Sequence, residues 1–166
     1  LLHGKSKSWR EYLFTEYHTH SAHNFFPQRT VRNGRFKLIH NLQPNQINPG
    51  YNFTMNRLFP GLQKIIAGTQ EPVRSAYALT RQPPEFELYD LKSDPFEFRT
   101  LANNETHENH LNLLKQNLEK WRKETDDPFL DPKNIERLKI EINECFNGAQ
   151  PSKKHLKLNY WNYFFE

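Results

Sequence analysis

The sequence is poor in cysteine and in long apolar runs. Cys145 is the only cysteine among the 166 residues, so no disulfide can form within the chain and cysteine pairing does not indicate a compartment. Its position at an expected helix end favours a small buried apolar group over a reactive thiol. No apolar run reaches the roughly 18 residues of a membrane-spanning helix, and no signal peptide is recognisable. We therefore expect no membrane partner.

Complete catalytic motifs are also absent from the sequence. It contains no Ser-His-Asp order, no glycine-rich phosphate loop and no RNA-binding aromatic motif. Its paired carboxylates, Asp126-Asp127 and Asp90 with Asp94, lie in expected turns and caps, which favours structural roles for them. We therefore expect no catalytic residue, no metal site and no cofactor in this chain.

Aromatic residues and a modest positive charge are what the composition does offer. Aromatics make up 14% of the chain and hydrophobic residues only 36%, so the core must rest largely on Phe, Tyr and Trp. The net charge of +4 favours anionic ligands. Because the basic residues are scattered rather than arranged in a stripe, we expect no nucleic-acid partner.

Residues 83–102, PPEFELYDLKSDPFEFRTLA, organise the pattern of the chain. Two prolines precede an alternating strand over residues 86–89, and Ser93-Asp94-Pro95 predicts a tight turn. An amphipathic helix over residues 106–123 follows, with apolar residues at helical spacing and Asn104 or Thr106 as its cap. Asp131-Pro132 predicts the start of a further helix, ended by Asn147-Gly148, before an aromatic tail over residues 156–165.

The first part of the chain predicts a strand meander. Residues 12–17, 28–32 and 35–41 are β-prone, and Asn33-Gly34 between the last two predicts a type I′ hairpin turn. Residues 42–82 show little pattern beyond a short helix over residues 58–67, ended by Gly68. The predicted fold class is α+β: a small antiparallel sheet of about four strands, packed against a long amphipathic helix, with a further helix and an aromatic tail.

Histidines and arginines are the candidate site residues. His18, His20 and His23 form a cluster at a strand end that admits three interpretations: a zinc site, structural histidines at the rim of the domain, or substrate contacts within a larger active site. Arg29, with Arg32, Arg35 and Lys37, lies in the predicted hairpin. Either these residues form a solvated strand face, with Arg32 pointing away from Arg29, or one arginine binds a sulfate or carboxylate.

Several segments together resemble the C-terminal part of sulfatases, and most of all that of heparan N-sulfatase (sulfamidase)-like enzymes. They are residues 9–20 (WREYLFTEYHTH), 26–32 (FPQRTVR), 36–42 (FKLIHNL), 87–91 (ELYDL), 94–97 (DPFE) and 125–128 (TDDP). The resemblance covers about residues 1–130 and fades beyond Asp131.

The resemblance implies a two-domain enzyme of the alkaline-phosphatase superfamily. Its N-terminal domain would hold calcium and a formylglycine made from a Cys-x-Pro-Ser-Arg motif, and its small C-terminal domain would be a four-stranded sheet with a packed helix. That motif is missing here, so this chain should be inactive alone. The implied partners are the N-terminal sulfatase domain in cis and a sulfated saccharide, with His18, His20, His23 and Arg29 on the substrate side.

We therefore expect residues 1–10 to be the tail of a catalytic domain, residues 11–130 a sulfatase C-terminal domain, and residues 131–166 a helical extension. The expected function is a non-catalytic portion of a sulfatase that packs on the catalytic domain and shapes its substrate entrance. The alternative is a free-standing module that binds anionic glycans. The first residues of the chain, which lack Met, suggest a cut through a longer protein, and the resemblance implies a periplasmic, extracellular or lysosome-like compartment for that parent.

Overall fold

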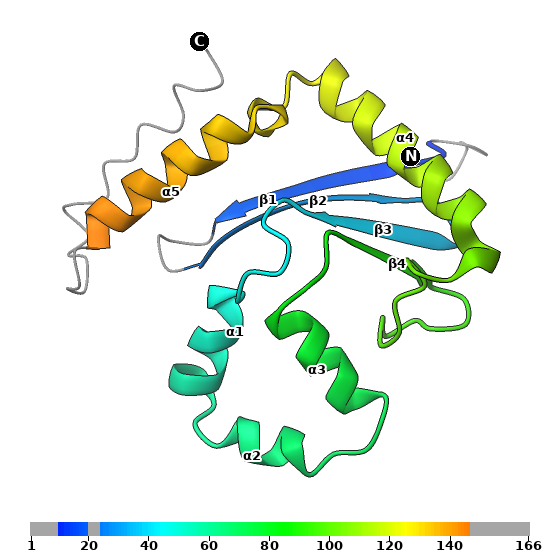
Figure 1. The fold of residues 1–166 in the computed structure, drawn as a ribbon. Helices are drawn as coiled ribbons and strands as arrows, with labels where there is room; N and C mark the ends of the chain where they lie inside the picture. The colour runs from blue at the N-terminus through cyan, green and yellow to red at the C-terminus, as the bar shows by residue number, and fades with distance from the viewer. Residues whose placement is uncertain (1–9, 20–23, 147–166) are drawn as a thin grey trace, which may run out of the picture.

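A four-stranded antiparallel sheet crosses the centre of the computed structural model, which describes residues 10–19 and 24–146 (Figure 1). The strands follow the chain in the order β1-β2-β3-β4, so the predicted meander and the joining fourth strand are confirmed. The strands are β1 (Leu13–Thr19), β2 (Phe25–Arg32), β3 (Phe36–Asn41) and β4 (Phe86–Asp90). Strand β2 begins earlier than predicted, because Phe25 already pairs with Thr19 of β1.

The hairpin between β2 and β3 lies where Asn33-Gly34 predicts it, but its turn is not type I′. Neither residue has a positive φ, and among the described glycines it is Gly61 that does. Instead, the Asn33 side chain closes the turn, because its Oδ1 accepts hydrogen bonds from the backbone N–H groups of Arg35 (2.8 Å) and Phe36 (2.7 Å). The asparagine therefore acts through its side chain rather than through a left-handed backbone.

Helix α4 (Glu108–Glu124) packs on one face of the sheet, as predicted. Its Leu114 and Leu118 are buried against Val31 of β2, Leu38 of β3 and Leu88 of β4. A single 3₁₀ turn, Glu105–His107, precedes the helix, and Asn104 Oδ1 caps this turn by accepting a hydrogen bond from the N–H of Thr106. The main core is therefore the layer between sheet and helix.

Helix α5 (Pro132–Phe146) begins at the predicted Asp-Pro pair, where Asp131 Oδ1 accepts a hydrogen bond from the N–H of Lys133. It forms a second, smaller core with Phe25 and with Phe129 of the 3₁₀ turn Pro128–Leu130. The residues it contributes are Ile135, Leu138 and Ile142. The side chain of Cys145, the predicted helix end at Asn147-Gly148 and the aromatic tail lie outside the described residues.

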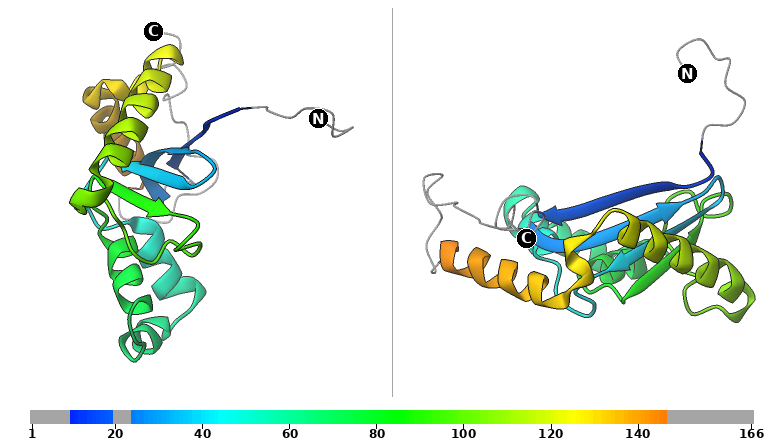
Figure 2. Two further views of the ribbon diagram at one scale, coloured as in Figure 1. Left: turned by 90° about the vertical axis from the view of Figure 1, so that its right-hand side faces the viewer. Right: turned by 90° about the horizontal axis from the view of Figure 1, so that it is seen from above.

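A helical lobe lies on the side of the sheet opposite α4 and α5 (Figures 1 and 2). The sequence predicts one helix over residues 58–67, whereas four short elements are present. They are α1 (Pro49–Phe53), the π-helical turn η2 (Thr54–Leu58), α2 (Leu62–Ala67) and α3 (Val73–Arg81). The predicted helix starts later because Pro60-Gly61 interrupts it, with Gly61 at a φ of 95°. None of the helices in the described part of the chain is both long and apolar enough to span a bilayer.

Candidate functional site

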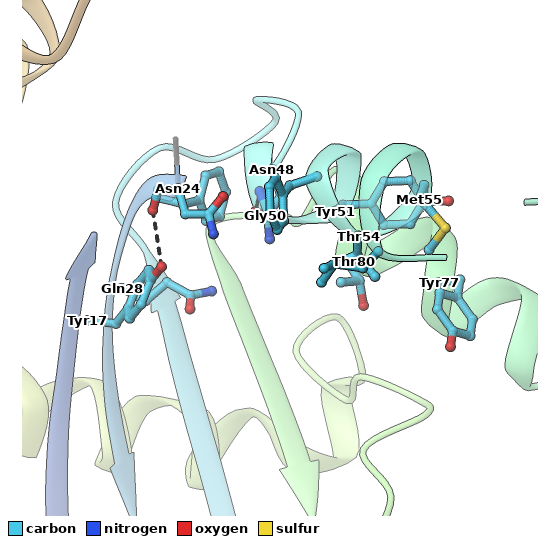
Figure 3. Close-up of a pocket in the computed structure, with 13 residues that line it drawn as sticks. Tyr17, Asn24, Gln28, Asn48, Gly50, Tyr51, Thr54, Met55, Tyr77 and Thr80 are labelled. Carbon is cyan, nitrogen blue, oxygen red and sulfur yellow. Dashed lines mark hydrogen bonds between the residues drawn. The ribbon is translucent and has the colours of Figure 1, made fainter. Parts of the chain in front are cut away.

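A pocket of about 510 Å³ lies where the ends of β1 and β2 meet the helical lobe (Figure 3). The sheet contributes Tyr17, Phe26 and Gln28, and the lobe contributes α1, η2 and α3. Gly50 allows the close approach of the capping Asn48, because a Cβ there would lie 3.1 Å from Asn48 Oδ1. The lobe residues that line the pocket are Asn48, Gly50, Tyr51, Phe53, Thr54, Met55, Leu58, Tyr77 and Thr80.

Residues on the sheet side of the pocket make polar contacts with neighbouring segments. The hydroxyl of Tyr17 donates a hydrogen bond to the backbone oxygen of Asn24 (3.1 Å), and Gln28 Nε2 donates one to Asn41 Oδ1 (2.5 Å). The side-chain oxygen Oδ1 of Asn24 is buried and has no hydrogen-bond partner among the described residues. An orphaned buried oxygen costs free energy unless something else satisfies it.

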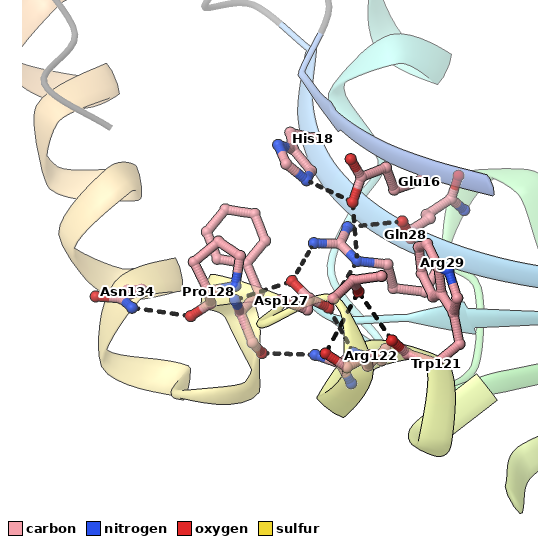
Figure 4. Close-up of polar contacts among 11 residues, drawn as sticks. Glu16, His18, Gln28, Arg29, Trp121, Arg122, Asp127, Pro128 and Asn134 are labelled. Atoms are coloured by element: carbon pink, nitrogen blue, oxygen red, sulfur yellow. Dashed lines mark hydrogen bonds and ion pairs between the residues drawn. The ribbon is translucent and has the colours of Figure 1, made fainter. Parts of the chain in front are cut away.

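A buried ion-pair cluster lies on the other side of the same strands (Figure 4). Arg29 is fully buried, and its guanidinium binds the Asp127 carboxylate through two hydrogen bonds, Nε to Oδ2 at 2.8 Å and Nη2 to Oδ1 at 2.6 Å. Arg122 of α4 donates a further bond from Nε to Asp127 Oδ2 (2.6 Å) and one from Nη2 to the carbonyl of Phe129 (2.7 Å). Two arginines therefore share one carboxylate at the junction of β2, α4 and α5.

This cluster sets the ionisation of Asp127. Burial alone would raise the pKa of its carboxyl, but the hydrogen bonds and charges of Arg29 and Arg122 outweigh burial and hold the pKa below its ordinary value. The carboxylate also accepts a hydrogen bond from the N–H of Phe129 at 3.0 Å, which caps the 3₁₀ turn. The predicted structural role of Asp126-Asp127 is confirmed for Asp127. The sequence allowed one hairpin arginine to bind a carboxylate, and Arg29 does so, although Asp127 was not predicted as its partner.

Of the predicted site residues, the structure brings His18 and Arg29 together. His18 Nε2 lies 3.6 Å from Glu16 Oε2, which is itself 3.8 Å from Arg29 Nε, and the imidazole packs edge-on against Phe129. Burial, and then the positive charge of Arg29, lower the pKa of His18, which favours the neutral form of the imidazole. His20 and His23 lie outside the described residues.

The solvated-face interpretation of the basic hairpin is wrong for Arg29, which is completely buried. The expected divergence from Arg32 is confirmed, because Arg32 is exposed. Arg35 instead pairs with Asp90 at 2.8 Å and Lys37 with Glu97 at 2.7 Å. The four cations thus face separate surroundings rather than forming one patch.

The donor groups in the described part of the chain do not fit a metal. No three of its His, Cys, Asp or Glu side chains converge as ligands would. Calcium, which the resemblance assigns to a catalytic domain, has no matching carboxylate cage among these residues. The pocket itself offers amides, hydroxyls and aromatic rings.

Comparisons with known proteins point to one enzyme class, although no protein-family model matches the chain. An ulvan-active sulfatase from Formosa agariphila is 32% identical over 126 residues, which are 73% of this chain and 20% of that protein. Human N-sulphoglucosamine sulphohydrolase is 30% identical over 120 residues, 67% of this chain and 22% of the enzyme.

Two solved structures with weak similarity are also sulfatases or bind a sulfated sugar. A 2-O GAG sulfatase superposes with a TM-score of 0.47 at 21% identity, covering 75% of this chain and 19% of that one. A protein in complex with its substrate D-glucosamine-2-N,6-O-disulfate gives a TM-score of 0.42 at 22% identity, covering 71% and 16%.

The chain spans about a fifth of the length of the first two curated relatives. The sulfamidase-like resemblance of the sequence is confirmed, because one of these relatives acts on N-sulphoglucosamine by its name and both are sulfatases. By homology this chain belongs with the sulfatases, as a sulfatase-associated α+β domain.

Proposed function

We propose that this chain is the non-catalytic, C-terminal portion of a sulfatase that packs on a catalytic domain in cis. The observation that carries the proposal is the extent of the homology: identities of 30–32% extend over 67–73% of this chain but over only 20–22% of each enzyme. The sequence contains no Cys-x-Pro-Ser-Arg motif, which favours a non-catalytic role for this chain.

The substrate entrance is the second part of the proposal. His18 lies at the end of β1, next in the chain to the pocket residue Tyr17, and His20 and His23 follow before Asn24. These histidines would face substrate at the edge of the catalytic domain. Arg29, which is fully buried against Asp127, would hold the strands beneath that edge.

The chemistry would come from the catalytic domain. Calcium and formylglycine would be supplied there, since the described residues of this chain offer no fitting set of ligands. The substrate would be a sulfated saccharide, an assignment supported by the names of the relatives, one active on ulvan and one on N-sulphoglucosamine.

The test compares the isolated chain with the intact protein that contains it. We expect the chain alone to release no sulfate from ulvan oligosaccharides or N-sulphoglucosamine, and the intact protein to do so. In the intact protein, His20→Ala should raise KM or lower kcat, whereas His110→Ala, an exposed position on the first turn of α4, should change neither. Unchanged kinetics for His20→Ala would remove that residue from the substrate side.

One result would favour the alternative of a free-standing module for anionic glycans. In that case the isolated chain would bind heparin fragments in low salt and release them in high salt, and the intact protein would hydrolyse no sulfate. The net charge of +4 would then account for the binding of anionic glycans.

A further inference from the structure

The pocket between the sheet and the helical lobe has an unusual lining for a domain with a net positive charge. Five of its described lining residues are aromatic, and the other polar ones are amides and hydroxyls. None of the described lining residues is Lys, Arg, Asp or Glu. A sulfate or carboxylate group would need a cationic partner to replace its water, so this lining selects against a charged ligand.

The same lining suits an uncharged ring that carries hydroxyl groups. Tyr17, Tyr51 and Tyr77 present flat apolar faces with polar tips, and Asn24, Gln28 and Asn48 present amides that can both donate and accept hydrogen bonds. The volume of about 510 Å³ falls within the range of small-molecule sites, about 300–1,000 Å³.

Asn24 supplies a second, independent observation. Its Oδ1 is buried without a hydrogen-bond partner among the described residues, and it lies 3.9 Å from where a Cβ of Gly50 would be, within the pocket lining. In Figure 3 the Asn24 side chain extends toward Asn48 and Gly50, across the space between strand and lobe. A ligand hydroxyl at this position would satisfy the orphaned oxygen.

We propose that this pocket is a subsite for an uncharged pyranose ring of a glycan chain. The choice of a glycan rests on the proposed function, whereas the preference for an uncharged ring comes from the pocket lining alone. Asn24 links the pocket to the histidine edge, because it lines the pocket and follows His23 directly in the chain. Tyr17 and Gln28 themselves lie on the face of the sheet opposite His18 and Arg29. A glycan with a sulfated residue at the histidine edge could place a neutral neighbour in this pocket.

The test uses the full 166-residue chain, labelled with ¹⁵N, and follows backbone amide shifts during titration. The probes are two uncharged pyranoses, N-acetyl-D-glucosamine and D-xylose, and the charged D-glucosamine-2-N,6-O-disulfate. We expect an uncharged sugar to shift the amides of Tyr17, Asn24 and Gly50 equally in low and high salt. We expect the disulfate to bind there more weakly.

Asn24→Leu separates binding from structure. It removes the orphaned oxygen while keeping the volume, so affinity should fall about fivefold, the loss of one ordinary hydrogen bond, while the unfolding temperature stays the same or rises. The matched control Asn52→Leu, exposed on α1 and outside the pocket, should leave affinity unchanged. If Asn24→Leu fails to fold, Thr80→Trp, which would fill the pocket from α3, should abolish the shifts, and Ala78→Trp on the same helix should not.

Three results would overturn the subsite: no shifts at these amides with either uncharged sugar, tighter binding of the disulfate that high salt removes, or unchanged affinity in both pocket variants. Failure of the proposed function looks different. If uncharged sugar binds as expected but the intact protein hydrolyses no sulfate ester or N-sulfate, the subsite stands and the sulfatase role falls.

Discussion

Asp127 is the residue on which the junction of β2, α4 and α5 depends. Its carboxylate neutralises two arginines, of which Arg29 is fully buried and Arg122 is 7% exposed. A buried ion pair stabilises a protein little more than hydrophobic residues of the same size would. Removal of one member is strongly destabilising, because it leaves an uncompensated charge in the interior. The sequence around Asp127 predicts only a turn aspartate, so its large contribution to stability could not be predicted from neighbouring residues.

We predict that Asp127→Asn lowers the free energy of unfolding by about 3–5 kcal/mol, because both guanidinium groups lose their counter-charge in a buried place. Urea denaturation at neutral pH measures the loss. Asp126→Asn is a matched control: Asp126 is exposed, and its positive φ of 49° suits asparagine. Equal losses in the two variants would contradict this account.

His40 should make stability depend on pH. Burial, then the charges of Arg122, Lys115 and Arg29, lower its pKa from 6.5 to about 4, while its ring stacks on Phe86 at 4.4 Å. The unfolded chain therefore takes up the proton at a higher pH than the folded chain. The stability is complete above about pH 6.5 and falls, by about 3 kcal/mol at most, as the pH drops toward 4.

His40→Phe should remove most of this slope, since it keeps the stacked ring and lacks the titrating group. Urea unfolding at a series of pH values between the two pKa values measures it. A smaller slope of the same sign should remain from His18, whose pKa is also lowered. A variant with the slope of the wild type would show that other groups control the acid response.

At the scale of elements, the sequence predicts the strands and helices whose apolar residues recur at a regular spacing. Strand alternation and helical spacing located the four strands and α4, and Asp131-Pro132 located the start of α5. The helical lobe was missed apart from α2, because its helices are short and Pro, Asn and Gly interrupt any period. The pocket was missed for a related reason. Its lining comes from the lobe and from β1 and β2, and no local sequence pattern predicts that these segments meet.

The β2–β3 turn offers a direct check of an element. Gly34 has no positive φ, and no atom lies within 4 Å of where its Cβ would be, so Gly34→Ala should stabilise the protein by about 0.4–1 kcal/mol. Asn33→Ala should instead destabilise it by about 1 kcal/mol for each lost hydrogen bond, of which there are two. Thermal unfolding compares them. A clear loss of stability in Gly34→Ala would contradict this account and favour the type I′ turn predicted from the sequence.

At the scale of the whole molecule, residues 10–19 and 24–146 form two hydrophobic cores. The larger lies between the sheet and α4, and the smaller lies between α5, Phe25 and Phe129. The two cores share no residues. Substitutions in one core and in the other should therefore lower the free energy of unfolding additively. The Arg29–Asp127–Arg122 cluster lies between them and joins the layers.

Leu138→Ala should therefore loosen α5 selectively. Leu138 is completely buried, and its truncation leaves a void in the smaller core only. In hydrogen exchange, amides of α5 should lose protection while those of α4 and the inner strands keep theirs. Ile140→Ala, on the same helix and 56% exposed, should leave exchange unchanged. An equal loss of protection everywhere would show one cooperative unit instead.

The pair of Arg29 and Asp127 has a consequence for synthesis. The two residues stand 98 positions apart, so the ribosome completes β2 well before it adds the carboxylate that Arg29 needs. Until then the guanidinium must stay hydrated, since a lone charge cannot enter the interior. The nascent sheet therefore remains open while the helical lobe and α4 emerge, and it exposes apolar strands that a holding chaperone would cover. The sheet can close around Arg29 only after Asp127, which follows α4, has left the exit tunnel.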